Sequence, residues 1–160
     1  MDFAKGLDRC EDFGSIFNLV KKSVEKAIER RREGLMIALQ YLPEGLGAYY
    51  GVGTNLIVMN KTLLEKIRLI YDERASKAYI FSVLMHEYLH SLGFLDEGLV
   101  QDLSYQICKM TLGESHLSTK IAKLGIGAFI PESARGIRIQ EKEEIEILDT
   151  FEMDSITYIG

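Results

Sequence analysis

The sequence predicts an α+β fold in which a small mixed sheet packs on one long helix. Helical and strand patterns do not alternate along the chain. An amphipathic helix comes first, two short apolar strands follow, and helices then dominate until strands return near the end. The chain has 160 residues, 47% of them hydrophobic, which suits one compact domain over residues 1–160 with a buried core.

The first predicted helix covers residues 17–32, where apolar side chains recur at helical spacing, and Gly34 ends it. The basic run Arg30–Arg32 falls at the C-terminal end of this predicted helix, where the helix dipole favours positive charge. The apolar run at residues 35–39 then predicts a buried strand.

A glycine-rich segment separates this strand from the next one. Glycines surround Ala48-Tyr49-Tyr50, and residues 55–59 predict a second apolar strand. Asn60 follows directly and is a suitable N-cap, because its side chain can accept a hydrogen bond from the first turn of a helix. We therefore predict a helix over residues 61–71.

A long helix is predicted over residues 75–92. It is apolar on most of its faces, so we expect it to be mostly buried. Gly93 ends this helix. The elements predicted beyond it are helices over residues 97–112 and 116–124 and short strands over residues 137–139 and 145–148.

The composition argues against two classes of partner. The formal charge of -5 and the pI near 5.3 disfavour nucleic acid, whose binding surfaces are basic. No apolar stretch reaches the length of a membrane span, and the N-terminus lacks the apolar core of a signal peptide. Cys10 and Cys108 are the only cysteines, which fits a reducing compartment. We therefore expect a soluble, cytoplasmic protein without a nucleic-acid or membrane partner.

The most informative pattern lies in residues 86–96, which read HExxHxxGxxD. Two histidines at positions i and i+4 of a helix lie on the same face, with Cβ atoms about 6 Å apart, so both rings can reach one metal ion. The Glu between them turns toward the water that the metal activates. Because the chain has only three histidines, this spacing is informative. We predict His86 and His90 as zinc ligands and Glu87 as the catalytic base.

A catalytic zinc ion usually takes a third protein ligand. Asp96 is the favoured candidate, because Gly93 permits a sharp turn that brings the chain back toward the metal. Asp96 is also a good N-cap for the following helix, and one carboxylate can serve both roles. The other candidates are His116, which is the only remaining histidine and the main alternative, and then Glu97 and Glu114.

The stretch from His86 to Asp96 resembles the metzincin clan of zinc metallopeptidases, in particular the Asp-containing branch typified by snapalysin. In that clan, two His on a helix and a third His or Asp beyond a turning Gly hold one zinc ion. The resemblance implies a zincin-like fold with His86, His90 and Asp96 as ligands and Glu87 as the base. In the related gluzincins the third ligand is a Glu on the helix after the motif, and Glu97 begins such a helix here.

The resemblance also implies where a substrate would lie. In zincin folds, a strand upstream of the active-site helix runs along the substrate. Residues 48–50 and residues 55–59 are both placed suitably for this role. An extended peptide would add to that strand through backbone hydrogen bonds.

These features predict a metallopeptidase that uses one zinc ion to hydrolyse peptide or protein substrates. One alternative is a zinc-bearing regulatory or binding domain without general peptidase activity, which a site closed by both Asp96 and His116 would favour. Another is a metal-dependent ribonuclease, because the histidine and glycine spacing is also similar to that of the YbeY-type ribonucleases. Those enzymes lack the Glu after the first His, and the acidic charge of this chain disfavours them.

Overall fold

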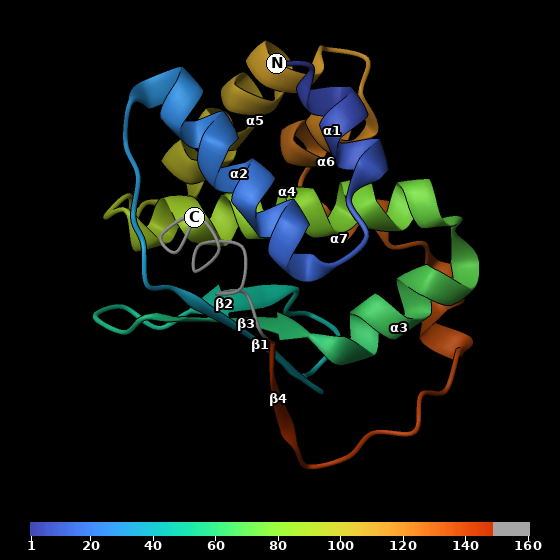
Figure 1. Ribbon diagram of the computed structural model, residues 1–160. Coiled ribbons are helices and arrows are strands. Elements are labelled where there is room, and N and C mark those ends of the chain that lie inside the picture. The colour runs from blue at the N-terminus through green and yellow to red at the C-terminus, as the bar shows by residue number, and fades with distance from the viewer. Residues whose placement is uncertain (149–160) are drawn as a thin grey trace.

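A computed structural model describes residues 1–148, and residues 149–160 of the predicted domain lie outside this range. The described part contains seven α-helices, one 3-10 helix and four strands (Figure 1). The combination of helices with one small mixed sheet, which the sequence predicts, is confirmed. The elements are α1 (Phe3–Arg9), α2 (Phe13–Ile28), β1 (Met36–Gln40), β2 (Ala48–Tyr50), β3 (Leu56–Asn60), α3 (Lys61–Ile70), α4 (Glu73–Ser91), α5 (Glu97–Leu112), α6 (Leu117–Leu124), α7 (Ile126–Phe129), η1 (Glu132–Gly136) and β4 (Ile145–Leu148).

The strands form one sheet in the order β2-β3-β1-β4. β1 and β3 are parallel, whereas β2 pairs antiparallel with β3 and β4 pairs antiparallel with β1. The two inner strands are buried at consecutive residues, as expected for strands that are covered on both faces. β2 is the edge strand of the sheet that lies nearest to α4 (Figure 1).

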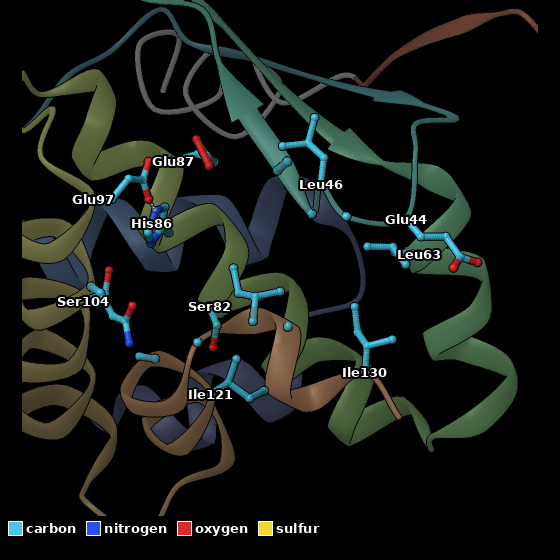
Figure 2. A pocket seen from close by; sticks show the side chains of 18 residues that line it. Glu44, Leu46, Leu63, Ser82, His86, Glu87, Glu97, Ser104, Ile121 and Ile130 are labelled. Carbon is cyan, nitrogen blue, oxygen red and sulfur yellow. Dashed lines mark hydrogen bonds and ion pairs between the residues drawn. The ribbon is translucent and has the colours of Figure 1, made fainter. Parts of the chain in front are cut away.

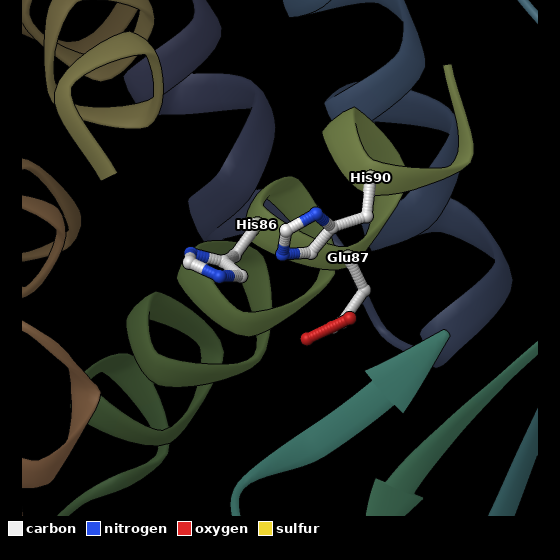
Figure 3. Close-up of side chains that lie close together, drawn as sticks. All are labelled: His86, Glu87 and His90. Carbon is white, nitrogen blue, oxygen red and sulfur yellow. The ribbon is translucent and has the colours of Figure 1, made fainter. Parts of the chain in front are cut away.

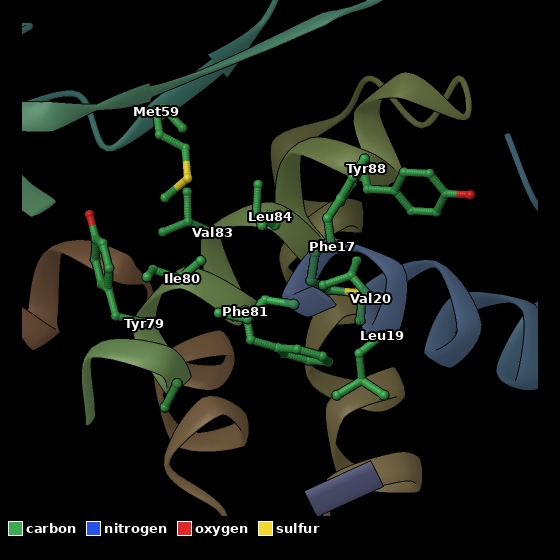
Figure 4. Packing of buried hydrophobic residues seen from close by; sticks show 14 of the residues in the cluster. Phe17, Leu19, Val20, Met59, Tyr79, Ile80, Phe81, Val83, Leu84 and Tyr88 are labelled. Atoms are coloured by element: carbon green, nitrogen blue, oxygen red, sulfur yellow. The ribbon is translucent and has the colours of Figure 1, made fainter. Parts of the chain in front are cut away.

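Helix α4 lies at the centre of the helical layer. Its N-cap is Asp72, whose side chain accepts a hydrogen bond from the Ala75 N–H at 2.8 Å. Side chains of other elements pack on it from opposite sides, with Met59 of β3 above it and Phe17 of α2 beside Tyr88 (Figure 4). The rings of Phe17 and Tyr88 meet edge to face, with centroids 5.7 Å apart. Burial on nearly all sides holds α4, and therefore the motif that it carries, in one position.

Most of the predicted helices are present close to their predicted positions. α5 has the predicted bounds, and α3 begins at the predicted cap, where Asn60 Oδ1 accepts a hydrogen bond from the Thr62 N–H at 3.0 Å. α4 has 19 residues, yet no helix within residues 1–148 is long and apolar enough to cross a membrane.

The first predicted helix differs from the structure at both ends. α2 begins earlier, because Asp12 and Ser15 form a reciprocal capping box, with 2.7 Å between the Ser15 N and Asp12 Oδ1 atoms. It ends at Ile28, because Glu29 adopts the left-handed conformation with φ of 55°. The prediction that Arg30–Arg32 ends a helix is therefore wrong. This basic run lies in the connection to β1.

One predicted strand is absent from the structure, and a short strand forms within the glycine-rich segment. Residues 137–139 are predicted as a strand but form none, and they follow η1 without joining the sheet. The glycine-flanked residues 48–50 form β2, which has only three residues and takes its shape from pairing with β3. The predicted strand over residues 145–148 is present as β4.

Candidate metal centre

The C-terminal half of α4 brings three potential metal ligands together. His86 and His90 lie one turn apart, and their ring centroids are separated by 4.9 Å. Ligand atoms of His86, Glu87 and His90 all lie within 4.8 Å of one another, so the group can hold a metal ion. Figure 3 shows the two rings side by side on one face of α4, while the Glu87 carboxylate extends toward β2.

The first residue of α5 adds a second carboxylate to this group. Glu97 Oε2 lies 2.9 Å from His86 Nε2, and Glu97 Oε1 lies 2.8 Å from His90 Nε2. The Glu97 carboxylate therefore bridges the two imidazoles (Figure 2 shows Glu97 beside His86). The Glu97 side chain is 76% exposed, so this side of the centre faces solvent.

The contacts of His90 fix the orientation of its ring, with Nε2 turned toward Glu97. His90 Nδ1 lies 2.7 Å from the Phe94 carbonyl oxygen, which can only accept, so Nδ1 carries the proton. When the ring is neutral, Nε2 offers a lone pair, and this atom is buried. It lies 2.8 Å from Glu97 Oε1, which is a hydrogen-bond distance, so these two atoms need a proton between them. A divalent ion would instead bind both atoms as neighbouring ligands. A divalent ion fits this donor set, with the Phe94 carbonyl orienting the ring from behind.

Burial dominates the electrostatics of Glu87. Loss of solvent raises the pKa of its carboxyl group to about 7, and the nearby Glu97 charge acts in the same direction. His90 and a hydrogen bond from the Tyr50 backbone partly oppose this shift. Burial also lowers the pKa of His86, although Glu97 acts in the opposite direction. Glu87 is thus a carboxylate that can take up and release a proton near neutral pH.

The side chain of Asp96, the favoured third ligand, lies at the N-terminus of α5. Asp96 Oδ1 accepts a hydrogen bond from the Gly98 N–H at 3.2 Å and so caps α5. The structure brings the next residue, Glu97, onto the histidines instead. The sequence offered one signal for this outcome, since Glu97 begins the helix that follows the motif.

The remaining candidates lie apart from the motif. His116 caps α6, with its Nδ1 accepting a hydrogen bond from the Ser118 N–H at 3.1 Å, and it lines a different cleft together with Arg74. Glu114 accepts a hydrogen bond of 3.4 Å from the Tyr105 hydroxyl beyond the far end of α5. Within residues 1–148, the group of possible ligands around His86 consists of His86, Glu87 and His90, and Asp96 and His116 lie outside it. Glu97 is not a member of this group either, but it contacts both imidazoles.

A cleft of about 410 Å³ opens beside His86, Glu87 and Glu97 (Figure 2). One wall is the segment before β2, which contains Leu46, and the opposite wall comes from α6, α7 and the residues around them. The buried Asn60 side chain holds the first wall, because its Nδ2 donates to the carbonyls of Pro43 and Leu46 at 2.9 and 2.7 Å. The apolar residues on the opposite side are Ile121, Ala122, Ile126 and Ile130.

β2 presents backbone groups toward this cleft. Asn60 N–H donates to the Gly47 carbonyl at 2.9 Å, and the antiparallel alternation then turns the backbone groups of Ala48 and Tyr50 away from β3. The Tyr50 backbone bonds to Glu87, while Ala48 lines the cleft. β3, the other candidate for the substrate strand, has a partner strand on each side. An extended peptide can therefore pair with β2.

Gly93 makes the turn that brings α5 back to the motif, and its φ of +105° strains any other residue. We expect Gly93→Ala to lower the free energy of unfolding by about 1–2 kcal/mol. If the centre holds a metal ion, the substitution should also weaken metal binding, because this turn carries the carbonyl of Phe94 and the carboxylate of Glu97. Urea denaturation and zinc titration measure the two effects.

Gly98→Ala is the matched control for this prediction. Gly98 lies in the first turn of α5, and an added Cβ would meet only Asp96 Oδ1, at an ordinary contact distance of 3.8 Å. This variant should be as stable as the wild type or slightly more stable. Equal losses of stability in the two variants would contradict the assigned role of Gly93.

No protein-family model, curated protein or solved structure matches this chain.

Proposed function

We propose that the protein is a zinc-dependent metallopeptidase with a zincin-like active site. The observation that carries this proposal is the convergence of His86, His90 and Glu97 beside the buried base Glu87, in an open cleft next to an edge strand. Each of these groups has a role in the proposed hydrolysis, and all of them lie beside the same cleft.

Zinc is the metal that this donor set favours, because two imidazoles and one carboxylate are typical of catalytic zinc sites. The ligands in this proposal are His86, His90 and Glu97, so Glu97 takes the place of the Asp96 that the metzincin resemblance implies. A Glu on the following helix is the gluzincin arrangement. When bound, zinc supplies Lewis acidity, which polarises a peptide carbonyl and acidifies water.

Glu87 moves the protons in the proposed reaction. Its carboxylate accepts a proton from the attacking water as the new C–O bond forms, and it then donates that proton to the amine nitrogen as the C–N bond breaks. The backbone N–H of Tyr50 orients the carboxylate by a hydrogen bond. In the metal-free protein, burial raises the pKa of this carboxyl group to about 7, and a pKa near neutral suits a group that must act first as a base and then as an acid.

The substrate in this proposal is an extended peptide that pairs with β2. The outward backbone groups of Ala48 provide the hydrogen bonds, and one substrate side chain enters the cleft toward Ile121 and Ile126. Because that wall is apolar, we expect cleavage next to apolar residues rather than charged ones.

The first test is cleavage of a proteome-derived peptide library by the zinc-loaded protein, with new termini identified by mass spectrometry. The matched control is Glu87→Gln, which keeps the shape of the side chain but cannot accept the proton. We expect cleavage by the wild type only, with apolar residues enriched on one side of the new termini. A wild type that holds zinc but yields the same termini as Glu87→Gln would overturn the proposal.

A further inference from the structure

The basic run after α2 attaches to the C-terminal end of the motif helix. The Arg32 backbone N–H donates to the buried Tyr88 hydroxyl at 2.7 Å, and Tyr88 follows Glu87 directly in α4. The Arg32 guanidinium then donates to the Ser91 carbonyl at 2.7 Å, next to His90. Carbonyls at the end of a helix lack intrahelical partners, and positive charge is favourable there. Arg32 is thus tied to α4 through both its backbone and its side chain.

The same guanidinium also holds the hairpin that joins β2 to β3. Nη1 donates to the Tyr50 hydroxyl at 3.0 Å, and Nη2 donates to the Thr54 carbonyl at 2.9 Å. The Tyr50 hydroxyl itself donates to the Thr54 carbonyl at 2.8 Å, which closes the network. One side chain therefore links the end of α4 to the last residue of β2 and to the loop beyond it.

We propose that Arg32 is a positioning residue that holds β2 at the distance from the metal centre that peptide binding requires. This inference rests on the proposed function. β2 has three residues and pairs on one side only, and the loop after it has Val52 72% exposed at its tip. Pairing with β3 fixes β2 within the sheet, whereas Arg32 fixes the hairpin against α4.

The expected effect is on the binding of extended ligands and not on the binding of zinc. Without Arg32, the hairpin occupies the position required for peptide binding in a smaller fraction of the molecules. The apparent dissociation constant of a ligand rises by the factor by which the competent state is depleted. A ligand that touches only the metal does not depend on the position of β2, so its affinity stays the same.

Two hydroxamates separate these effects in the zinc-loaded protein. Acetohydroxamate reaches only the metal, whereas a hydroxamate that carries a dipeptide with an apolar first residue also reaches β2. Calorimetry on the wild type and on Arg32→Ala measures both dissociation constants. We expect Arg32→Ala to weaken the dipeptidyl hydroxamate by at least about tenfold and acetohydroxamate by less than about twofold. Arg32→Lys should weaken the dipeptidyl hydroxamate to an intermediate degree, because an ammonium cannot reproduce the planar fork.

Arg30→Ala is the matched control. Arg30 also donates to a carbonyl at the end of α4, that of Leu92 at 2.7 Å, and its guanidinium lies over the Phe94 ring. Neither contact involves the hairpin. Arg30→Ala therefore removes the same charge from the same helix end, and we expect it to leave both hydroxamate affinities unchanged.

Amide hydrogen exchange of the metal-free full chain gives a readout that does not depend on ligands. We expect residues 48–54 to exchange faster in Arg32→Ala than in Arg30→Ala, with α4 unchanged. Unchanged dipeptidyl affinity in Arg32→Ala would overturn the inference, and so would an equal loss for both hydroxamates. If the zinc-loaded wild type binds neither hydroxamate, the proposed function itself fails and this inference fails with it.

Discussion

Glu97→Ala is expected to weaken zinc binding by more than about a hundredfold, which exceeds the usual effect of losing an outer-shell partner of a metal ligand. The reason is geometric, because the two Glu97 oxygens lie 2.9 and 2.8 Å from the Nε2 atoms of His86 and His90. Removing this carboxylate leaves two imidazoles as the only ligands in the proposed set. Competition with a chromophoric chelator measures the affinity of the metal-free protein for zinc.

The adjacent acid provides the control for this prediction. Asp96→Ala removes the cap of α5 and should lower the free energy of unfolding by about 1 kcal/mol, while zinc affinity stays within about tenfold of the wild type. Asp96→Asn preserves the cap and should change neither property. Glu97→Gln keeps the shape of the side chain but loses the charge, so it should bind zinc poorly. Loss of zinc in Asp96→Asn together with its retention in Glu97→Gln would reverse the assignment of the two acids.

Glu87→Gln is expected to stabilise the metal-free protein at alkaline pH by about 3 kcal/mol, besides abolishing hydrolysis. Burial raises the pKa of Glu87 from 4.5 to about 7 in the folded state. Below pH 4.5 the carboxyl group is protonated in both states and contributes no difference. Between pH 4.5 and 7 the unfolded chain loses this proton first, so the folded state becomes less stable as the pH rises. Each pKa unit corresponds to about 1.4 kcal/mol.

Urea denaturation in the presence of a chelator tests this prediction at pH 4 and at pH 8. The wild type and Glu87→Gln should have similar free energies of unfolding at pH 4, and the variant should be more stable at pH 8. Glu132→Gln is the control, because this carboxylate is exposed and its replacement should have little effect at either pH. A stability difference between wild type and Glu87→Gln that does not change with pH would show that the burial of this charge is not its cause.

Helical periodicity explains why the two histidines of the site could be predicted from the sequence, whereas the third ligand could not. The i, i+4 spacing of His86 and His90 places both rings on one face of any helix, and the apolar surroundings made that helix a buried one. The third ligand depends on the path of a short loop, which periodicity does not describe. Asp96 could serve as a cap or as a ligand, and only the direction in which the chain turns at Gly93 decides between Asp96 and Glu97.

The same holds for the fold: features set by neighbouring residues could be predicted from the sequence, whereas features set by distant residues could not. α3 and α5 carry their own capping residues in the sequence, so their first residues could be predicted. α2 ends where Glu29 adopts the left-handed conformation, and no glycine marks this position in the sequence. The sequence therefore predicts too late an end for the helix and places the basic run Arg30–Arg32 inside it. The contacts of Arg32 cross 59 residues to Ser91, and no sequence pattern indicates a contact over such a separation. β2, with three residues, depends on β3 for its hydrogen bonds.

The most direct test of the proposed metal centre is zinc X-ray absorption spectroscopy of the loaded protein, with and without acetohydroxamate. We expect a zinc ion with two imidazole nitrogens, one carboxylate oxygen and an exchangeable oxygen ligand that acetohydroxamate displaces. Asp96→Asn and His116→Ala should give the same spectra as the wild type. A shell of four protein ligands that acetohydroxamate leaves unchanged would contradict an open catalytic centre and would favour a structural zinc site.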